Sequence, residues 1–419
     1  MIRWFSEIGV SMATRDRIIV GLDIGTTKIC CLITELSESG DLEEIGFGVS
    51  ESKGLKRGLV VNMEQTVEAI RGCVEDAERM AGIRVDEVYT GIAGGHIQGI
   101  STSAVIAIKG DEIMHADKRR VVDQAKDFAK PVGVEIIHVL PQEFTVDDIS
   151  GIIDPVGMAG SRLEARVHIV TGSVSAVSNI TKCAQKAGLG LQDIVLQQIA
   201  SAAAILTPDE MQLGVILMDI GGGTTDIAVF NDGAIRHTCV LALGGDNITN
   251  DIAVGLRTPI AEAERLKIKY GQAIASRVSP DEQLEAPSIG GDTVNMVPRR
   301  ILSEIIESRV EELFKLAYNE IRNTGLSEMM SAGLVLTGGA SSLEGVAELA
   351  EGIMHMPVRV GYPRGVKGLV ELVNNPAYAT AVGLCVYEAG KPSYSFKPKG
   401  TNVFERILER MIGWFKEVF

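Results

Sequence analysis

The sequence has no apolar run that approaches the ~20 residues needed to span a bilayer, so no membrane span is predicted among its 419 residues. Its six cysteines form no CxxC pair, and most lie in apolar runs. This favours reduced core thiols in a cytoplasmic protein. The six histidines are scattered without metal-ligand spacing, so no role is assigned to them.

Positive charge and aromatic residues are also scarce. The chain has 40 basic and 55 acidic residues, a net charge of −15, which argues against broad nucleic-acid binding. Aromatic residues make up 5% of a sequence that is otherwise rich in aliphatic side chains, as is typical of an α/β protein with buried sheets. The length predicts two or more domains.

The common nucleotide-binding motifs are missing as well. No G-x-x-x-x-G-K-[ST] occurs, and no G-x-G-x-x-G follows a strand. These absences exclude a P-loop and a dinucleotide fingerprint.

A different glycine turn is present at 217–230, "LMDIGGGTTDIAVF". An apolar strand ends on Asp219, and glycines and threonines follow it. Glycines let the backbone approach another group closely, and successive N–H groups in such a turn form an anion site. Asp219 would then position Mg²⁺. The alternative is a hairpin whose Asx-type turn needs Asp and Gly for local reasons.

A near copy of this turn favours the nucleotide interpretation. Residues 19–33, "IVGLDIGTTKICCLI", repeat the strand, an aspartate (Asp23), a glycine and two threonines. A third glycine turn lies in 333–345, "GLVLTGGASSLEG", with a helix expected to start at Ser341 or Ser342, and helix N-termini favour anions. The two near copies predict a duplicated fold with two half-sites facing one phosphate chain, and the three turns together indicate a nucleotide.

Apolar patterning divides the chain into two lobes, an insert and a detached tail. The predicted boundaries are 1–85 and 164–212 for the first lobe, 86–163 for an inserted subdomain, 213–390 for the second lobe, 391–402 for a linker and 403–419 for a terminal helix. The second lobe includes a subdomain at about 246–325 and a helix at 376–390 that returns to the first lobe. The first lobe opens with strands at 18–22, 29–35 and 43–49 and a helix at 63–82.

The motifs resemble those of the actin–heat-shock-chaperone–sugar-kinase superfamily. "LDIGTTK" and "LMDIGGGTTDIAV" resemble its two phosphate motifs, and "GLVLTGGASSLEG" its adenosine motif. "VLQQIASAAAIL" and "PAYATAVGL" resemble the two connecting helices at the interdomain hinge. Within this superfamily the chain is most similar to the FtsA family of bacterial cell-division proteins, through its wide insert, "GGDNITNDIA", "AEAERLKIKYG" and its amphipathic tail.

This resemblance implies a two-lobed actin-like α/β fold, with a duplicated mixed sheet flanked by helices and with ATP and Mg²⁺ in the cleft between the lobes. It implies that Asp23 and Asp219 position the metal and act in catalysis with Gln197. The implied phosphate-side residues are Gly25, Thr26, Thr27, Lys28, Gly221, Gly222, Gly223, Thr224, Gly338, Gly339 and Ser342. The implied ribose and adenine side comprises Gly244, Gly245, Glu264 and Lys267, although an ordinary exposed helix pair would also explain Glu264 and Lys267.

Three activities fit such a fold: a metabolite kinase, a chaperone ATPase and a filament-forming scaffold. A kinase needs a general base, usually a carboxylate, but the resemblance puts Gln197 at the relevant position, with Gln198 as the alternative if the register is shifted. An amide can orient water but accepts no proton usefully. A chaperone needs a long substrate domain, whereas about 29 residues follow Gly390. A scaffold with at most slow Mg-dependent hydrolysis remains, and an actin-like pilus-assembly or chaperone-type ATPase is the alternative.

The resemblance also implies partners at the cytoplasmic side of the cell membrane, at the division site. One is the C-terminal tail of the tubulin-like division protein FtsZ, for which Arg299 and Arg300 are candidate contacts; a solvated helix face is the plain alternative. The second partner is another copy of the chain in a head-to-tail filament, because duplicated lobes offer two unlike ends. The insert is the expected contact, with a passive decoration as the alternative. No nucleic-acid partner is expected.

The segment 403–419, "VFERILERMIGWFKEVF", is predicted to be a membrane-surface helix. At ~100° per residue its apolar residues fall within a ~180° arc, and lipids are the third expected partner. Such a helix commonly docks on its own domain instead, but the polar linker and the terminal aromatics favour the interface. The candidate lipid contacts are Phe404, Ile407, Leu408, Met411, Trp414, Phe415 and Phe419.

Overall fold

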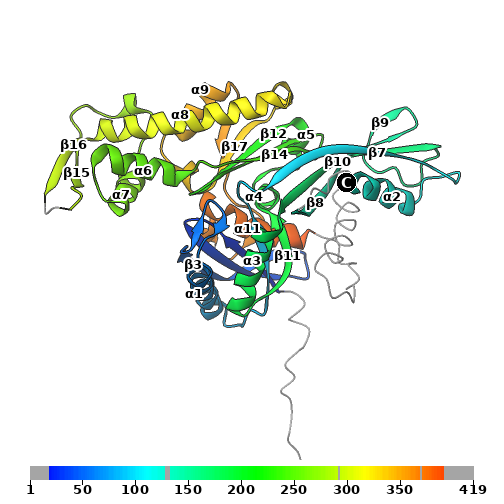
Figure 1. The fold of residues 1–419 in the computed structure, drawn as a ribbon, viewed down its shortest axis with the longest axis horizontal. Helices are drawn as coiled ribbons and strands as arrows, with labels where there is room; N and C mark the ends of the chain where they lie inside the picture. The colour runs from blue at the N-terminus through cyan, green and yellow to red at the C-terminus, as the bar shows by residue number, and fades with distance from the viewer. Residues whose placement is uncertain (1–17, 128–132, 291–292, 369, 391–419) are drawn as a thin grey trace, which may run out of the picture.

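The computed structural model describes residues 18–127, 133–290, 293–368 and 370–390. Two lobes, each with its own central sheet, lie one above the other in Figure 1, and a third sheet projects to one side. The predicted linker 391–402 and terminal helix 403–419 lie outside the described residues.

The first lobe is built on a six-stranded sheet with the order β11–β6–β1–β2–β3–β19. Its strands are β1 (Ile18–Ile24), β2 (Lys28–Leu36), β3 (Leu42–Glu51), β6 (Glu87–Ile92), β11 (Gly190–Leu196) and β19 (Val366–Lys367). The antiparallel meander β1–β2–β3 confirms the three strands predicted at the start of this lobe. Helices α1 (Met63–Ala81) and α3 (Val174–Ala187) bury apolar side chains such as Ile70 and Ile180 in one core with this sheet.

The insert has a four-stranded sheet of its own, in the order β7–β10–β8–β9, packed with one helix. Its elements are β7 (Gln98–Ala107), α2 (His115–Lys126), β8 (Val134–Val146), β9 (Ile149–Ile152) and β10 (Arg162–Ser173). The predicted boundaries of 86–163 are therefore wrong at both ends. β6 is parallel to β1 and β11 in the first lobe, and all of β10 belongs to the insert. Apolar periodicity identifies a strand but not the sheet it joins.

The second lobe repeats the plan of the first. Its five-stranded sheet has the order β14–β13–β12–β17–β18, from strands β12 (Val215–Ile220), β13 (Thr225–Asn231), β14 (Ala234–Leu241), β17 (Gly333–Thr337) and β18 (Val358–Val360). An antiparallel meander β12–β13–β14 with β17 parallel to β12 matches β1–β2–β3 with β6. This correspondence confirms the predicted duplication.

Helices and a hairpin complete the second lobe. They are α6 (Gly245–Leu256), α7 (Ile260–Tyr270), α8 (Arg299–Asn323), α9 (Val346–Met354) and the hairpin of β15 (Gln283–Pro287) and β16 (Val294–Pro298). The expected helix start at Ser341 or Ser342 is wrong: Gly339–Ser342 forms a 3-10 turn, and α9 begins only after Gly345, whose φ is 82°. Figure 1 shows the β15–β16 hairpin and the insert at opposite ends of the long axis.

Two helices, α4 (Gln197–Ile205) and α11 (Ala379–Ala389), lie between the lobes (Figure 1). Their backbones touch, because a Cβ on Gly383 would lie only 1.8 Å from the Ala200 carbonyl oxygen. α11 also packs on β1 and β2 of the first lobe. Short elements join these parts: β4 (Leu55–Lys56), β5 (Leu59–Val60), α5 (Pro208–Leu213) and α10 (Val370–Val373).

Candidate nucleotide-binding site

The two aspartate-glycine turns lie face to face between the lobes. Each closes with the same hydrogen bond: Gly25 N–H donates to the Lys28 carbonyl at 3.0 Å, and Gly221 N–H to the Thr224 carbonyl at 2.9 Å. A Cβ on Gly222 would lie 2.2 Å from Thr27 Cγ2. The turns are therefore in contact across the cleft, and a side chain at position 222 would require Thr27 to move.

The third glycine turn closes the same cavity. Gly338 has a φ of 83°, and a Cβ there would lie 2.4 Å from Asp219 Oδ1. Gly338 and Gly339 line the cavity together with residues of the first two turns. Ser342 is exposed and is not among the lining residues.

Asp23 is buried at the first turn and has two polar neighbours. Gln197 Nε2, from the start of α4, donates to Asp23 Oδ1 at 3.0 Å, and Lys28 Nζ lies 3.8 Å from Oδ2. Burial raises the pKa of Asp23 to about 6, Lys28 opposes this shift and Asp219 adds to it. The structure thus brings Asp23, Gln197 and Lys28 together at one wall of the cavity.

Asp219 is held from both connecting helices. Ser201 of α4 donates to Asp219 Oδ2 at 2.8 Å, and Thr380 of α11 lies 3.4 Å from the same oxygen. The Ser201 and Thr380 hydroxyls are 3.0 Å apart. Burial raises the pKa of Asp219, while its Ser201 bond and Lys28 lower it. The Asp219 side chain therefore has polar partners on both helices.

A third carboxylate, Asp226, was not predicted as a site residue. It is 4% exposed and accepts from Gln198 Nε2 and from Thr224 Oγ1, both at 3.1 Å. Burial, followed by the charges of Asp219 and Asp23, raises its pKa to about 8. Gln197 and Gln198 thus serve different aspartates. The sequence did contain a signal for Asp226. It comes two residues after the turn, so in an antiparallel hairpin it lies opposite Asp219.

The residues predicted for the ribose and adenine side form polar contacts with one another and with the second glycine turn. Lys267 Nζ on α7 donates to the Gly245 carbonyl at 3.1 Å and pairs with Glu264 at 2.6 Å. Gly245 N–H donates to the Gly221 carbonyl at 2.9 Å. Gly244, Gly245, Glu264 and Lys267 do not line the cavity among the described residues, so their contact with a nucleotide stays a prediction.

The predicted partner-binding arginines are already paired. Arg299 donates from Nε to the Tyr270 carbonyl at 2.9 Å and forms an ion pair with Glu282 at 2.7 Å. Arg300 pairs with Glu304 at 3.2 Å, one turn along α8, and its side chain is 50% exposed. Arg300 is therefore the more available of the two.

The donor set fits a divalent cation and a phosphate chain. Asp23, Asp219 and Asp226 place three carboxylates around a cavity in which Lys28 is the nearest cation. Such an excess of buried carboxylate is costly unless a cation joins it, and oxygen ligands suit Mg²⁺. The glycine turns present backbone N–H groups without Cβ atoms, as an anion cradle requires.

Comparison with solved structures defines the class of this fold. The chain is similar to a chain of the "PilM-PilN type IV pilus biogenesis complex" (TM-score 0.64, 17% identity, 89% of this chain and 99% of that chain). It is also similar to MreB5 of Spiroplasma citri bound to ADP (TM-score 0.56, 14% identity, 89% and 96%). The fold is that of the actin-like ATPases.

Sequence comparison identifies the family. The family model "Cell division protein FtsA" matches residues 216–383. The family model "SHS2 domain inserted in FTSA" matches residues 94–171, the region of the insert described above. The cell division protein FtsA of Pseudomonas aeruginosa is 45% identical over 96% of this chain and 98% of its own length. That of Neisseria meningitidis is 41% identical over 97% and 100%. The chain belongs to the FtsA family of actin-like cell-division proteins.

Proposed function

We propose that the chain binds ATP with Mg²⁺ between its lobes, assembles into filaments at the inner face of the cytoplasmic membrane, and tethers FtsZ there. The main support for ATP binding is the pair of turns that bring Asp23 and Asp219 to one cavity. Membership of a cell-division family supports the setting at the division site.

The residues of the cleft have distinct roles in this proposal. Asp23 and Asp219 would hold Mg²⁺ through its waters, and the ion would neutralise phosphate charge. The backbone of the three glycine turns binds phosphate oxygens, and Lys28 adds a positive charge. Gln197, whose amide already donates to Asp23, orients a water but accepts no proton, so hydrolysis is slow.

Nucleotide binding would change the distance between the lobes. Since Gly222 and Thr27 are in contact, phosphates enter between the turns only if they separate. Ser201 and Thr380 link Asp219 to both connecting helices, so the hinge responds to what the carboxylate binds. Closure of this kind is a recurring way to couple a ligand to assembly.

The test of the nucleotide site is isothermal titration of the full chain with ATP, in Mg²⁺ and in EDTA. Asp219→Ala and Asp23→Ala should weaken Mg-dependent binding at least about tenfold, which is ~1.4 kcal/mol. Asp281→Ala, at an exposed position outside the cavity, is the control and should bind as the unmodified protein does. Unchanged ATP affinity in both aspartate variants would falsify the proposal.

Head-to-tail assembly is supported by the shape of the molecule. The insert and the β15–β16 hairpin lie at opposite ends (Figure 1), and an open chain of subunits needs two unlike ends. The insert also exposes apolar side chains, among them Met114 at 59% and Ile149 at 63%. These are surfaces that a second copy would cover.

Membrane attachment is proposed through 403–419. Among the described residues, no helix is both long enough and apolar enough to cross a bilayer. One amphipathic segment binds a membrane weakly and reversibly, and a filament would multiply such anchors by avidity.

FtsZ would bind through its tail near Arg300.

A further inference from the structure

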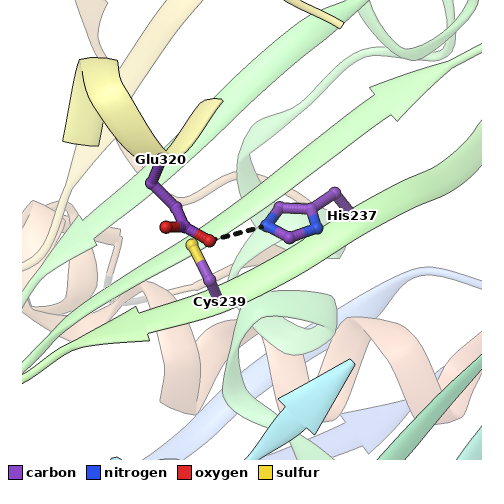
Figure 2. Close-up of side chains that lie close together, drawn as sticks. All are labelled: His237, Cys239 and Glu320. Atoms are coloured by element: carbon purple, nitrogen blue, oxygen red, sulfur yellow. Dashed lines mark ion pairs between the residues drawn. The ribbon is translucent and has the colours of Figure 1, made fainter. Parts of the chain in front are cut away.

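A histidine, a cysteine and a glutamate meet in the second lobe, outside the nucleotide cleft. His237 and Cys239 are two positions apart on β14, so both point to the same face of the sheet. Glu320 reaches them from α8, the helix that packs over this face. Figure 2 shows the three side chains directed at one another, with the cysteine sulfur beside the carboxylate.

The spacing of the three donor atoms fits a metal site. His237 Nε2 lies 3.5 Å from Glu320 Oε1, and all three donor atoms lie within 4.8 Å of one another. Two ligands at ~2.0–2.1 Å from a tetrahedral zinc ion are ~3.3–3.4 Å apart, so the first pair needs almost no movement. In the described part of the chain this is the one group of three such side chains.

The surroundings of the His237 imidazole also favour a metal site. His237 Nε2 is buried and makes no hydrogen bond in the structure; its closest charged neighbour is Glu320. A plain His–Glu ion pair would account for two members of the group but leaves the position of Cys239 unexplained.

We propose that His237, Cys239 and Glu320 bind a zinc ion, with water as the fourth ligand. Nitrogen, sulfur and carboxylate oxygen are all zinc ligands, and this combination is softer than the oxygen set that suits Mg²⁺. On binding, the Cys239 thiol gives its proton to solvent and the thiolate coordinates the ion. The protein carries this site in addition to the nucleotide cleft, and the two share no donor.

The consequence of metal binding is a fixed contact between α8 and β14. β14 is the strand on which the insert rests: His168 of β10 bonds Thr238 at 2.9 Å, and Gln142 of β8 donates to the Ile235 carbonyl at 2.8 Å. Zinc would clamp the strand from the face opposite Thr238. The site therefore links the insert, through β14, to the long helix of the second lobe.

The test uses the full chain, stripped of metal with a chelator and checked for folding by circular dichroism. Zinc is titrated calorimetrically without nucleotide, and cobalt is added as a spectroscopic probe. One equivalent per chain is expected, and cobalt should show a thiolate-to-metal charge-transfer band. Zinc should also raise the melting temperature, because it binds the folded state in preference.

Two variants and a control assign the site. Cys239→Ser should abolish the cobalt band, and Glu320→Gln, at a side chain that is 41% exposed, should weaken zinc binding at least about tenfold, the lower range for changes around a metal. Glu311→Gln on the same helix is the control and should leave both unchanged. Absence of stoichiometric zinc binding, or a band that persists in Cys239→Ser, would overturn the proposal.

Discussion

Asp219 and Asp226 lie directly opposite each other in the β12–β13 hairpin, whereas the same register of the β1–β2 hairpin pairs Asp23 with Cys30. The two hairpins are therefore copies in backbone but not in charge. The second lobe brings two carboxylates to the cleft and the first lobe brings one. This asymmetry makes ionisation of Asp226 costly, and its pKa is raised to about 8, further than the pKa of Asp23.

Asp226→Asn should flatten the pH dependence of stability above neutral pH. The folded-state pKa of Asp226 is about 8 against an ordinary 3.8, so between these values the folded state holds a proton that the unfolded state has lost. Stability then falls as pH rises, and the loss is complete above about pH 8. From pH 7 to 8.5 the unmodified protein should lose on the order of 1 kcal/mol.

The measurement is urea unfolding in EDTA at several pH values between 7 and 9. Asparagine keeps one of the two oxygens, which accept separately from Gln198 and Thr224, and it does not titrate, so the variant should lose less stability over this range. An equal slope for both proteins would contradict the assigned pKa.

Much of this fold follows from local pattern. Strand alternation, the helix at 63–82 and the duplicated hairpins could all be predicted, because each depends on residues close in sequence. The boundaries of the insert could not, since β6 and β10 are alike as strands and differ only in the sheet they join. The α9 start was missed because Gly345 postpones the helix beyond Ser342.

The same limit applies to the sites. Asp23 and Asp219 stand out in the sequence because each ends a strand before glycines. The His237–Cys239–Glu320 cluster does not, because its third member lies on a helix far along the chain and only the packing of α8 on β14 unites them. Spacing rules detect ligands that share a loop or helix face, and this group shares neither.

Charged substitutions on the insert should impair filament formation. Met114→Asp and Ile149→Asp change exposed side chains, so the free energy of unfolding should change by less than ~0.5 kcal/mol. If the insert is covered in the filament, the critical concentration for pelleting with Mg·ATP should rise at least about tenfold. Met80→Asp, on α1 of the first lobe and 47% exposed, is the matched control. If the two insert variants pellet as efficiently as the control, the insert has another role.

Charge reversal at Arg300 should weaken binding of the FtsZ tail. Its ion pair with Glu304 is exposed and of small value, so Arg300→Glu should leave folding intact. Loss of a contact to a carboxylate at a rim position should lower affinity about three- to tenfold. Fluorescence anisotropy of a labelled tail peptide measures this, with Arg322→Glu at the other end of α8 as the comparison. Equal affinities for the two variants would place the tail elsewhere.

Truncation after Gly400 should release the protein from membranes while leaving ATP affinity unchanged. The removed segment holds all the candidate lipid contacts, from Phe404 to Phe419. Flotation with liposomes in Mg·ATP should recover the full chain and little of the truncated one. A truncated protein that floats as well as the full chain would mean that another surface is the anchor.

Electron microscopy of the pure full chain, with Mg·ATP and with and without liposomes, tests the central claim most directly. Actin-like assembly at a membrane predicts filaments that depend on Mg·ATP, coat the liposomes, and are lost with Asp219→Ala. Dispersed single particles under every condition, from protein that binds ATP normally, would contradict it.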